Sequence, residues 1–160
     1  MTRPEFRRLT NYVFGGAATI ITNVSLIVGL ASAGASRGAL LGSLLTIAIA
    51  DNISDSLGIH LYKEAEGAAG QLSILSTVLN FSARLLVSLT FIALVVFLPG
   101  ERAIPWAIAW GLILLVITSY LINRSIGRRS IWEITKHVLV AVVVIFLSHS
   151  VGHLIHQHFS

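Results

Sequence analysis

Residues 38–62, GALLGSLLTIAIADNISDSLGIHLY, decide the fold of this chain. A helix needs about 20 apolar residues to cross the hydrocarbon core of a bilayer, and this stretch is long enough. Asp51, Asn52 and Asp55 lie inside the apolar run rather than at its ends. The stretch therefore predicts a transmembrane helix that carries polar groups at membrane depth.

Four further apolar runs cover residues 12–34, 73–98, 104–122 and 134–155. The 160-residue chain is 55% hydrophobic and 11% charged, whereas a soluble domain carries about 25% charged residues. In lipid the backbone must satisfy its own hydrogen bonds, which favours helices. We predict an all-α integral membrane bundle of five transmembrane helices, forming a single domain over residues 1–160. Basic residues precede the first run as in a signal peptide, but its length and the spans after it favour a retained helix.

The positions of the basic residues predict the orientation. Basic residues accumulate on the cytoplasmic side of membrane proteins. With the N-terminus inside, the outer side has only Arg37 and Arg102, and the inner side holds Arg3, Arg7, Arg8, Lys63, Arg124, Arg128, Arg129 and Lys136. We expect a cytoplasmic N-terminus, an outer or lumenal C-terminus and a prokaryotic inner membrane. The net charge of +4 then needs no nucleic-acid partner.

Asp51 and Asp55 are the strongest candidates for function. Their spacing puts both carboxylates on one helix face, about 6 Å apart along the axis. An Asp at the centre of a span costs about 2.5–3.5 kcal/mol to insert, so such residues usually serve a function. Carboxylate oxygens suit a divalent cation, and a protonated relay is a second use. The structural alternative is an ion pair with Arg84, which an antiparallel third helix brings to the depth of Asp51.

Other features are open to two interpretations. His149, His153 and His156 share one helix face, so they form either a secondary metal site or the polar end of an interfacial helix. Gly38 and Gly42 form a GxxxG pair, which indicates close packing within the subunit or a dimer face. The absence of cysteine excludes disulfides and thiolate chemistry. We see no spacing typical of an enzyme and expect no tightly bound cofactor.

Three short stretches resemble the vacuolar iron transporter family, which moves iron and manganese ions. They are ITNVSLIVG at residues 21–29, GSLLTIAIADNIS at 42–54 and VGHLI at 151–155. The resemblance implies a five-helix subunit, a homodimer and an ion path at the dimer interface. It places the acid of the second helix at Asp51.

The chain departs from the family pattern at several positions. Ala18 stands where the family has an Asp, Ile47 where it has a Met, and Asn52 where it has an aromatic residue. The acidic cytosolic segment between helices two and three is replaced by a short linker. The leading hypothesis is proton-coupled transport of divalent cations through Asp51 and Asp55, assisted by oxygens of Asn23, Ser25 and Asn52. The alternatives are a non-transporting scaffold or regulator, and a path for another solute.

Overall fold

The computed structural model describes residues 3–67, 70–98, 100–125 and 131–159, and the regular secondary structure in these segments is entirely helical. The helices are α1 (Arg3–Ser32), α2 (Arg37–Ala65), α3 (Gly70–Phe97), α4 (Gly100–Ser125) and α5 (Ile131–Phe159). The predicted all-α architecture of five helices is confirmed. The basic turn with Arg128 and Arg129 lies outside the described residues, as do the side chains of Arg3, Arg7 and Arg8.

Four helices are long and apolar enough to cross a membrane, over Arg37–Ala65, Ser73–Phe97, Arg102–Arg124 and Ile131–Phe159. The described apolar part of α1, Gly16–Ser32, is shorter. Large apolar side chains such as Leu86 and Phe146 are exposed on the outer surface of the bundle. Apolar surface of this kind is unfavourable in water and suits contact with lipid tails. The helices therefore indicate an integral membrane protein.

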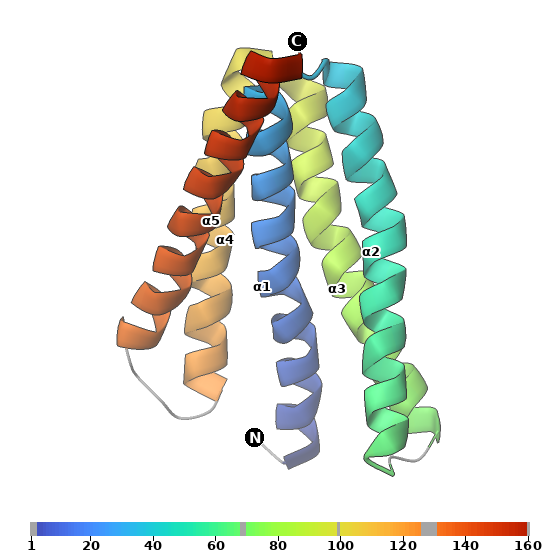
Figure 1. Ribbon diagram of the computed structural model, residues 1–160. Coiled ribbons are helices and arrows are strands. Elements are labelled where there is room, and N and C mark those ends of the chain that lie inside the picture. Colours follow the sequence, from blue (N-terminus) through green and yellow to red (C-terminus); the bar gives the residue numbers. More distant parts are fainter. Residues whose placement is uncertain (1–2, 68–69, 99, 126–130, 160) are drawn as a thin grey trace.

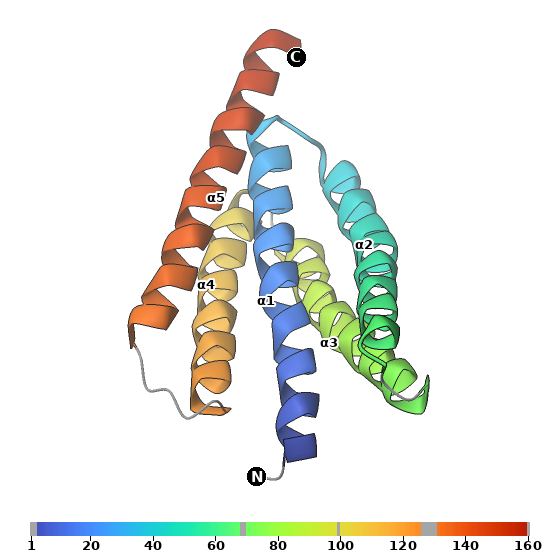
Figure 2. The ribbon, with the colours of Figure 1, turned by 60° about the horizontal axis from the view of Figure 1, so that its bottom comes forward.

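Consecutive helices run in opposite directions, and α1 occupies the centre of the bundle (Figure 1). Helix α1 contacts all four other helices, while α2 and α3 form the most extensive pair. Figure 2 shows α2 and α3 on one side of α1, with α4 and α5 on the other. The N-terminus and the α2–α3 connection share one end of the bundle, which we call the α2–α3 end. The C-terminus lies at the opposite end (Figure 1).

The apolar core surrounds α1, where Ile20, Val24 and Ile27 are buried together with Phe91 of α3 and Leu115 of α4. These α1 positions recur at intervals of three and four residues, which places them on one helical stripe. The stripe packs toward α3 and α4 and leaves another side of α1 to face α2 and α5.

Glycines set the closest helix approaches. A Cβ added at Gly152 would lie 2.2 Å from the carbonyl oxygen of Gly29, so α1 and α5 touch backbone to backbone at that point. By contrast, a Cβ at Gly42 would meet no atom of the described residues within 4 Å. The expectation that the Gly38–Gly42 pair packs helices tightly within the subunit is therefore wrong at Gly42, whereas a dimer face is untested.

The beginning of α2 is fixed by two polar side chains. Ser36 is the N-cap, and its hydroxyl accepts a hydrogen bond from the backbone N–H of Ala39. The neighbouring Arg37 reaches across to the last turn of α3, where its Nε donates to the carbonyl of Val95 at 3.0 Å. Its Nη2 also contacts the carbonyl of Val96. Arg37 thus satisfies carbonyls that the end of a helix leaves without partners.

Candidate ion site between α1, α2 and α3

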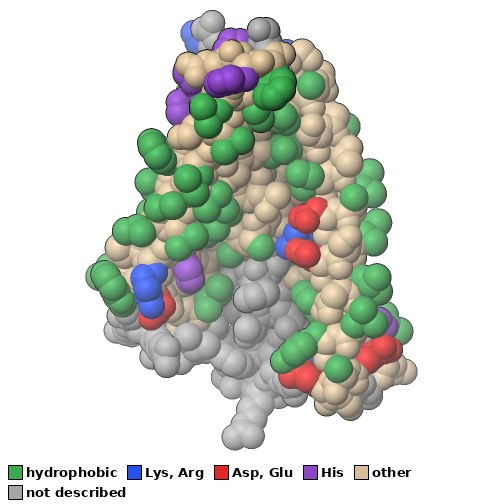
Figure 3. All heavy atoms as spheres, in the orientation of Figure 1, with side chains coloured by type: hydrophobic (Ala, Val, Ile, Leu, Met, Phe, Trp, Pro, Cys, Tyr) green, Lys and Arg blue, Asp and Glu red, His purple; other side chains and the backbone are tan. Residues whose placement is uncertain are grey.

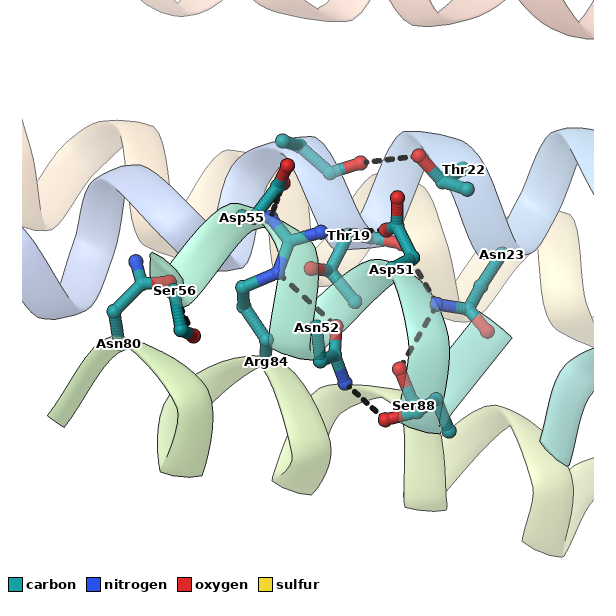
Figure 4. A network of polar contacts seen from close by, with 12 residues as sticks. Thr19, Thr22, Asn23, Asp51, Asn52, Asp55, Ser56, Asn80, Arg84 and Ser88 are labelled. Carbon is teal, nitrogen blue, oxygen red and sulfur yellow. Dashed lines mark hydrogen bonds and ion pairs between the residues drawn. The ribbon is translucent and has the colours of Figure 1, made fainter. Parts of the chain in front are cut away.

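The site centres on Arg84, whose buried side chain extends from α3 to a single turn of α2 (Figure 4). Its Nη2 lies 2.6 Å from Asp51 Oδ2, and its Nη1 lies 2.7 Å from Asp55 Oδ2. Its Nε donates to Asn52 Oδ1 at 3.0 Å. The planar guanidinium thus uses all three of its nitrogens on α2.

Helical spacing explains why α2 offers three partners to one arginine. Positions 51, 52 and 55 lie within one turn and about one face of the helix. Asn52 is fully buried, and its amide nitrogen donates to the carbonyl of Ala48 at 2.8 Å, which orients its oxygen toward Arg84. The ion pair between Arg84 and the aspartates, raised from the sequence as a structural alternative, is present.

The pairing leaves the carboxylates accessible. Arg84 is only 2% exposed, but the side chain of Asp51 is 38% exposed and that of Asp55 is 50% exposed. Both lie on the side of α2 that faces α1 (Figure 4). Figure 3 shows acidic and basic side chains together about halfway along this face, amid hydrophobic and uncharged surface. The two aspartates are therefore neither sealed against Arg84 nor located at an end of the bundle.

The charges of the cluster do not balance. Two ionised carboxylates and one guanidinium leave one excess negative charge. Each ion pair includes a contact through Oδ2, and the aspartate side chains are 38% and 50% exposed, so a further ligand can reach each carboxylate. An excess charge at membrane depth is unfavourable unless water, a cation or another protein surface meets it. The arrangement can therefore bind a cation on its exposed side.

The predicted auxiliary ligands divide into two groups. Asn52 belongs to the cluster, and Asn23 lies nearby on α1, donating to Thr19 O at 2.8 Å and to Ser88 Oγ at 3.2 Å. Asn23 Oδ1 is buried without a hydrogen-bond partner among the described residues. Ser25 points elsewhere, since it lines an apolar groove of about 350 Å³ between α1 and α5. The expectation that Ser25 joins the aspartates is wrong, because positions 23 and 25 face opposite sides of a helix.

Position 18, where the resemblance would place an Asp, adds no side-chain ligand. Ala18 lies on α1, and its carbonyl accepts a hydrogen bond from Thr22 Oγ1 at 3.1 Å. Polar residues of α3 that sequence reasoning missed lie instead around Arg84. Asn80 and Ser88 are buried one turn to either side of it. Their spacing of four residues from Arg84 is the signal that could have identified them.

The histidines near the C-terminal end do not converge. His149 Nδ1 lies 2.7 Å from Ser32 Oγ, and the rings of His149 and His153 are 6.3 Å apart between centroids. The His156 ring packs against Gly34. Within the described ranges, no group of three or more His, Cys, Asp or Glu side chains could hold a metal ion. Neither the histidines nor the aspartates among the described residues thus supply three such ligands.

Comparisons with known proteins identify no relative: no family model matches the chain, and neither a curated protein nor a solved structure does. The resemblance to the vacuolar iron transporters therefore stays a prediction from the sequence. The geometry around Arg84 is consequently the main structural indication of function.

Proposed function

We propose that this chain is a membrane transporter of divalent metal ions such as iron or manganese, coupled to protons, with Asp51 and Asp55 as ligands on the ion path. The main support for this proposal is that one buried arginine neutralises the charge of only one of the two half-exposed carboxylates. Oxygen ligands with excess negative charge attract divalent cations. The short sequence resemblance to a family that moves such ions supports the same class of substrate.

The proposed working form is a homodimer joined at the face of α1 and α2 that carries the aspartates. One subunit contributes two carboxylates and a net charge of −1, which neutralises only half of the charge of a divalent cation. Two copies around a twofold axis would contribute two excess negative charges and four carboxylates, which balances one divalent ion. The dimer would also remove the charged cluster from lipid.

Ion uptake into liposomes tests this proposal. Purified protein is reconstituted, and entry of Mn²⁺ or Fe²⁺ is followed with a trapped fluorescent indicator. Asp51→Asn and Asp55→Asn keep the side-chain shape and an acceptor for Arg84, but each removes a negative charge. Both variants should lose uptake, whereas Glu133→Gln, which alters an ion pair with Lys136 near the start of α5, should retain it. Uptake that survives in both aspartate variants contradicts the proposal.

A non-transporting scaffold or regulator is the second candidate, and the burial of Arg84 favours it. Arg84 is 2% exposed and joins α3 to three neighbouring residues of α2, as expected for a lock between helices. In this case the wild-type protein carries no ions, and Arg84→Ala destabilises the fold as much as Asp51→Ala. Metal flux in the wild-type protein excludes this candidate. A dimer without flux supports it.

A further inference from the structure

Polar side chains form successive layers where α2 packs against α3, a contact that we call the α2–α3 seam. Nearest the α2–α3 end, Ser73 Oγ lies 2.9 Å from His60 Nδ1. Further in, Ser56 Oγ donates to Asn80 Oδ1 at 3.4 Å. Arg84 and Asn52 form the next layer. Each layer is about one or two helical turns from the next, so they follow the seam from one end of the bundle to the charged cluster.

Beyond the cluster the side chains buried in the seam are mainly apolar, until Arg37 contacts backbone carbonyls of α3 at the opposite end. Ser88, one turn past Arg84, turns to Asn23 of α1. The buried residues that follow are Leu44 and Leu40 on α2, and Phe91 and Val95 on α3. Polar pairs that only hold two helices together could occur at any depth. Here the pairs between two side chains lie in the half between the α2–α3 end and Arg84, so the two halves of the seam differ in polarity.

The outer layer of the seam meets solvent. His60 Nε2 lies 3.3 Å from Glu64 Oε1, and these side chains are 26% and 54% exposed. The inner contact between Ser56 and Asn80 is long for a hydrogen bond between side-chain oxygens, so a water molecule can replace it at little cost. Buried water typically occupies sites of this kind, where several polar groups surround it.

We propose that the α2–α3 seam is a one-sided path for water that reaches the Arg84 cluster from the α2–α3 end. The path approaches Arg84 from the seam, whereas the exposed sides of Asp51 and Asp55 face α1. It gives the cluster a second, narrow approach for small polar molecules. Only the role of this path in transport rests on the proposed function. Water can enter the α2–α3 seam whether or not the protein transports ions.

Cysteine labelling tests the path, and the chain suits this method because it contains no cysteine. Ser56→Cys and Ala48→Cys form a matched pair. Both residues are buried, at 3% and 2% exposure, and each lies one turn from Asn52 on opposite sides. A small methanethiosulfonate ammonium reagent reacts with the thiolate, which requires water around the sulfur. Modification of each chain is measured by mass spectrometry in sealed vesicles, with Glu64→Cys marking the α2–α3 end.

The expected result is modification of Ser56→Cys at least about tenfold faster than Ala48→Cys, since only a hydrated thiol ionises. The labelling should occur when the reagent is on the side of the α2–α3 end. Equal rates for the two variants, or labelling of Ser56→Cys only from the opposite side, would overturn the path. Gel filtration checks the fold of each variant. If Ser56→Cys fails that check, Asn80→Cys, at the buried partner of Ser56 on α3, is labelled in its place and judged by the same outcomes.

The labelling and the flux experiment can fail independently. Labelled Ser56→Cys in a protein without metal flux leaves the path intact and contradicts the proposed transport. Metal flux with an unlabelled Ser56→Cys overturns the path and leaves the proposed transport in place.

Discussion

Replacing Arg84 with methionine is the most informative perturbation of the fold. Arg84→Met keeps a long side chain in the α2–α3 seam but removes the guanidinium that contacts Asp51, Asn52 and Asp55. Polar contacts between membrane helices contribute about 0.6 kcal/mol on average and up to about 1.7 kcal/mol, so three of them amount to about 2–5 kcal/mol. Removing one partner of a buried ion pair costs about 3–5 kcal/mol.

Partial exposure of the aspartates reduces the expected loss. The two carboxylates are 38% and 50% exposed, so water can solvate each of them once Arg84 is gone. We therefore expect Arg84→Met to lower the free energy of unfolding by about 2–4 kcal/mol. The assay is reversible unfolding in mixed micelles with increasing sodium dodecyl sulfate, followed by circular dichroism and tryptophan fluorescence.

Two further variants complete this experiment. Lys136→Met removes a partner of Glu133 in an exposed i,i+3 ion pair, so its loss should stay below about 0.5 kcal/mol. Adding Asp51→Asn and Asp55→Asn to Arg84→Met removes the carboxylates left without a counter-ion and should restore part of the lost stability. If Arg84→Met costs no more than Lys136→Met, or if neutralising the aspartates weakens the fold further, the ion-pair account is refuted.

Other predictions concern helix packing and the histidines. Gly152→Ala should cost about 1–3 kcal/mol, because its Cβ would lie 2.2 Å from the carbonyl oxygen of Gly29, while Gly42→Ala should be near neutral in the same unfolding assay. Arg37→Gln should cost about 1 kcal/mol and speed amide hydrogen exchange near the end of α3, because carbonyls lose a charged donor; unchanged exchange there would contradict the capping role. His149→Ala should leave Mn²⁺ uptake unchanged, since His149 bonds to Ser32 and belongs to no metal cluster among the described residues. A loss of uptake would show that it takes part in the ion path.

The helices were predictable because the bilayer imposes a length and a composition on each of them. Apolar runs near 20 residues predict the helix count, and the antiparallel order of α2 and α3 predicts that Arg84 lies near Asp51. Helix ends were less accurate. The helix α1 begins at Arg3, well before the predicted start at residue 12, because hydropathy marks the apolar part of a helix and not its polar extension.

The details of the site depend on helix rotation, which hydropathy does not give. The rotation of α1 turns Ser25 away from the aspartates, toward α5, and Asn23 toward Ser88. The sequence also could not show that Asn52 would be the third partner of Arg84, because that requires the offset between α2 and α3. From the sequence, the face with the excess charge could be predicted only as two acidic residues on one side of a helix. Its exposure could not be predicted, because it depends on how the other helices surround it.

The contacts of Arg37 and Arg84 constrain how the molecule can move. Arg84 holds the middle of α2 to α3, and Arg37 holds the start of α2 to the last turn of α3. Two clamps separated along one pair of helices prevent sliding and rotation of either helix against the other. A conformational change would then displace α2 and α3 as a single rigid arm. Helix α1 contacts α3 far more extensively than α2, so such an arm would stay attached to α1 through α3 while the sparser junction between α2 and α1 opens.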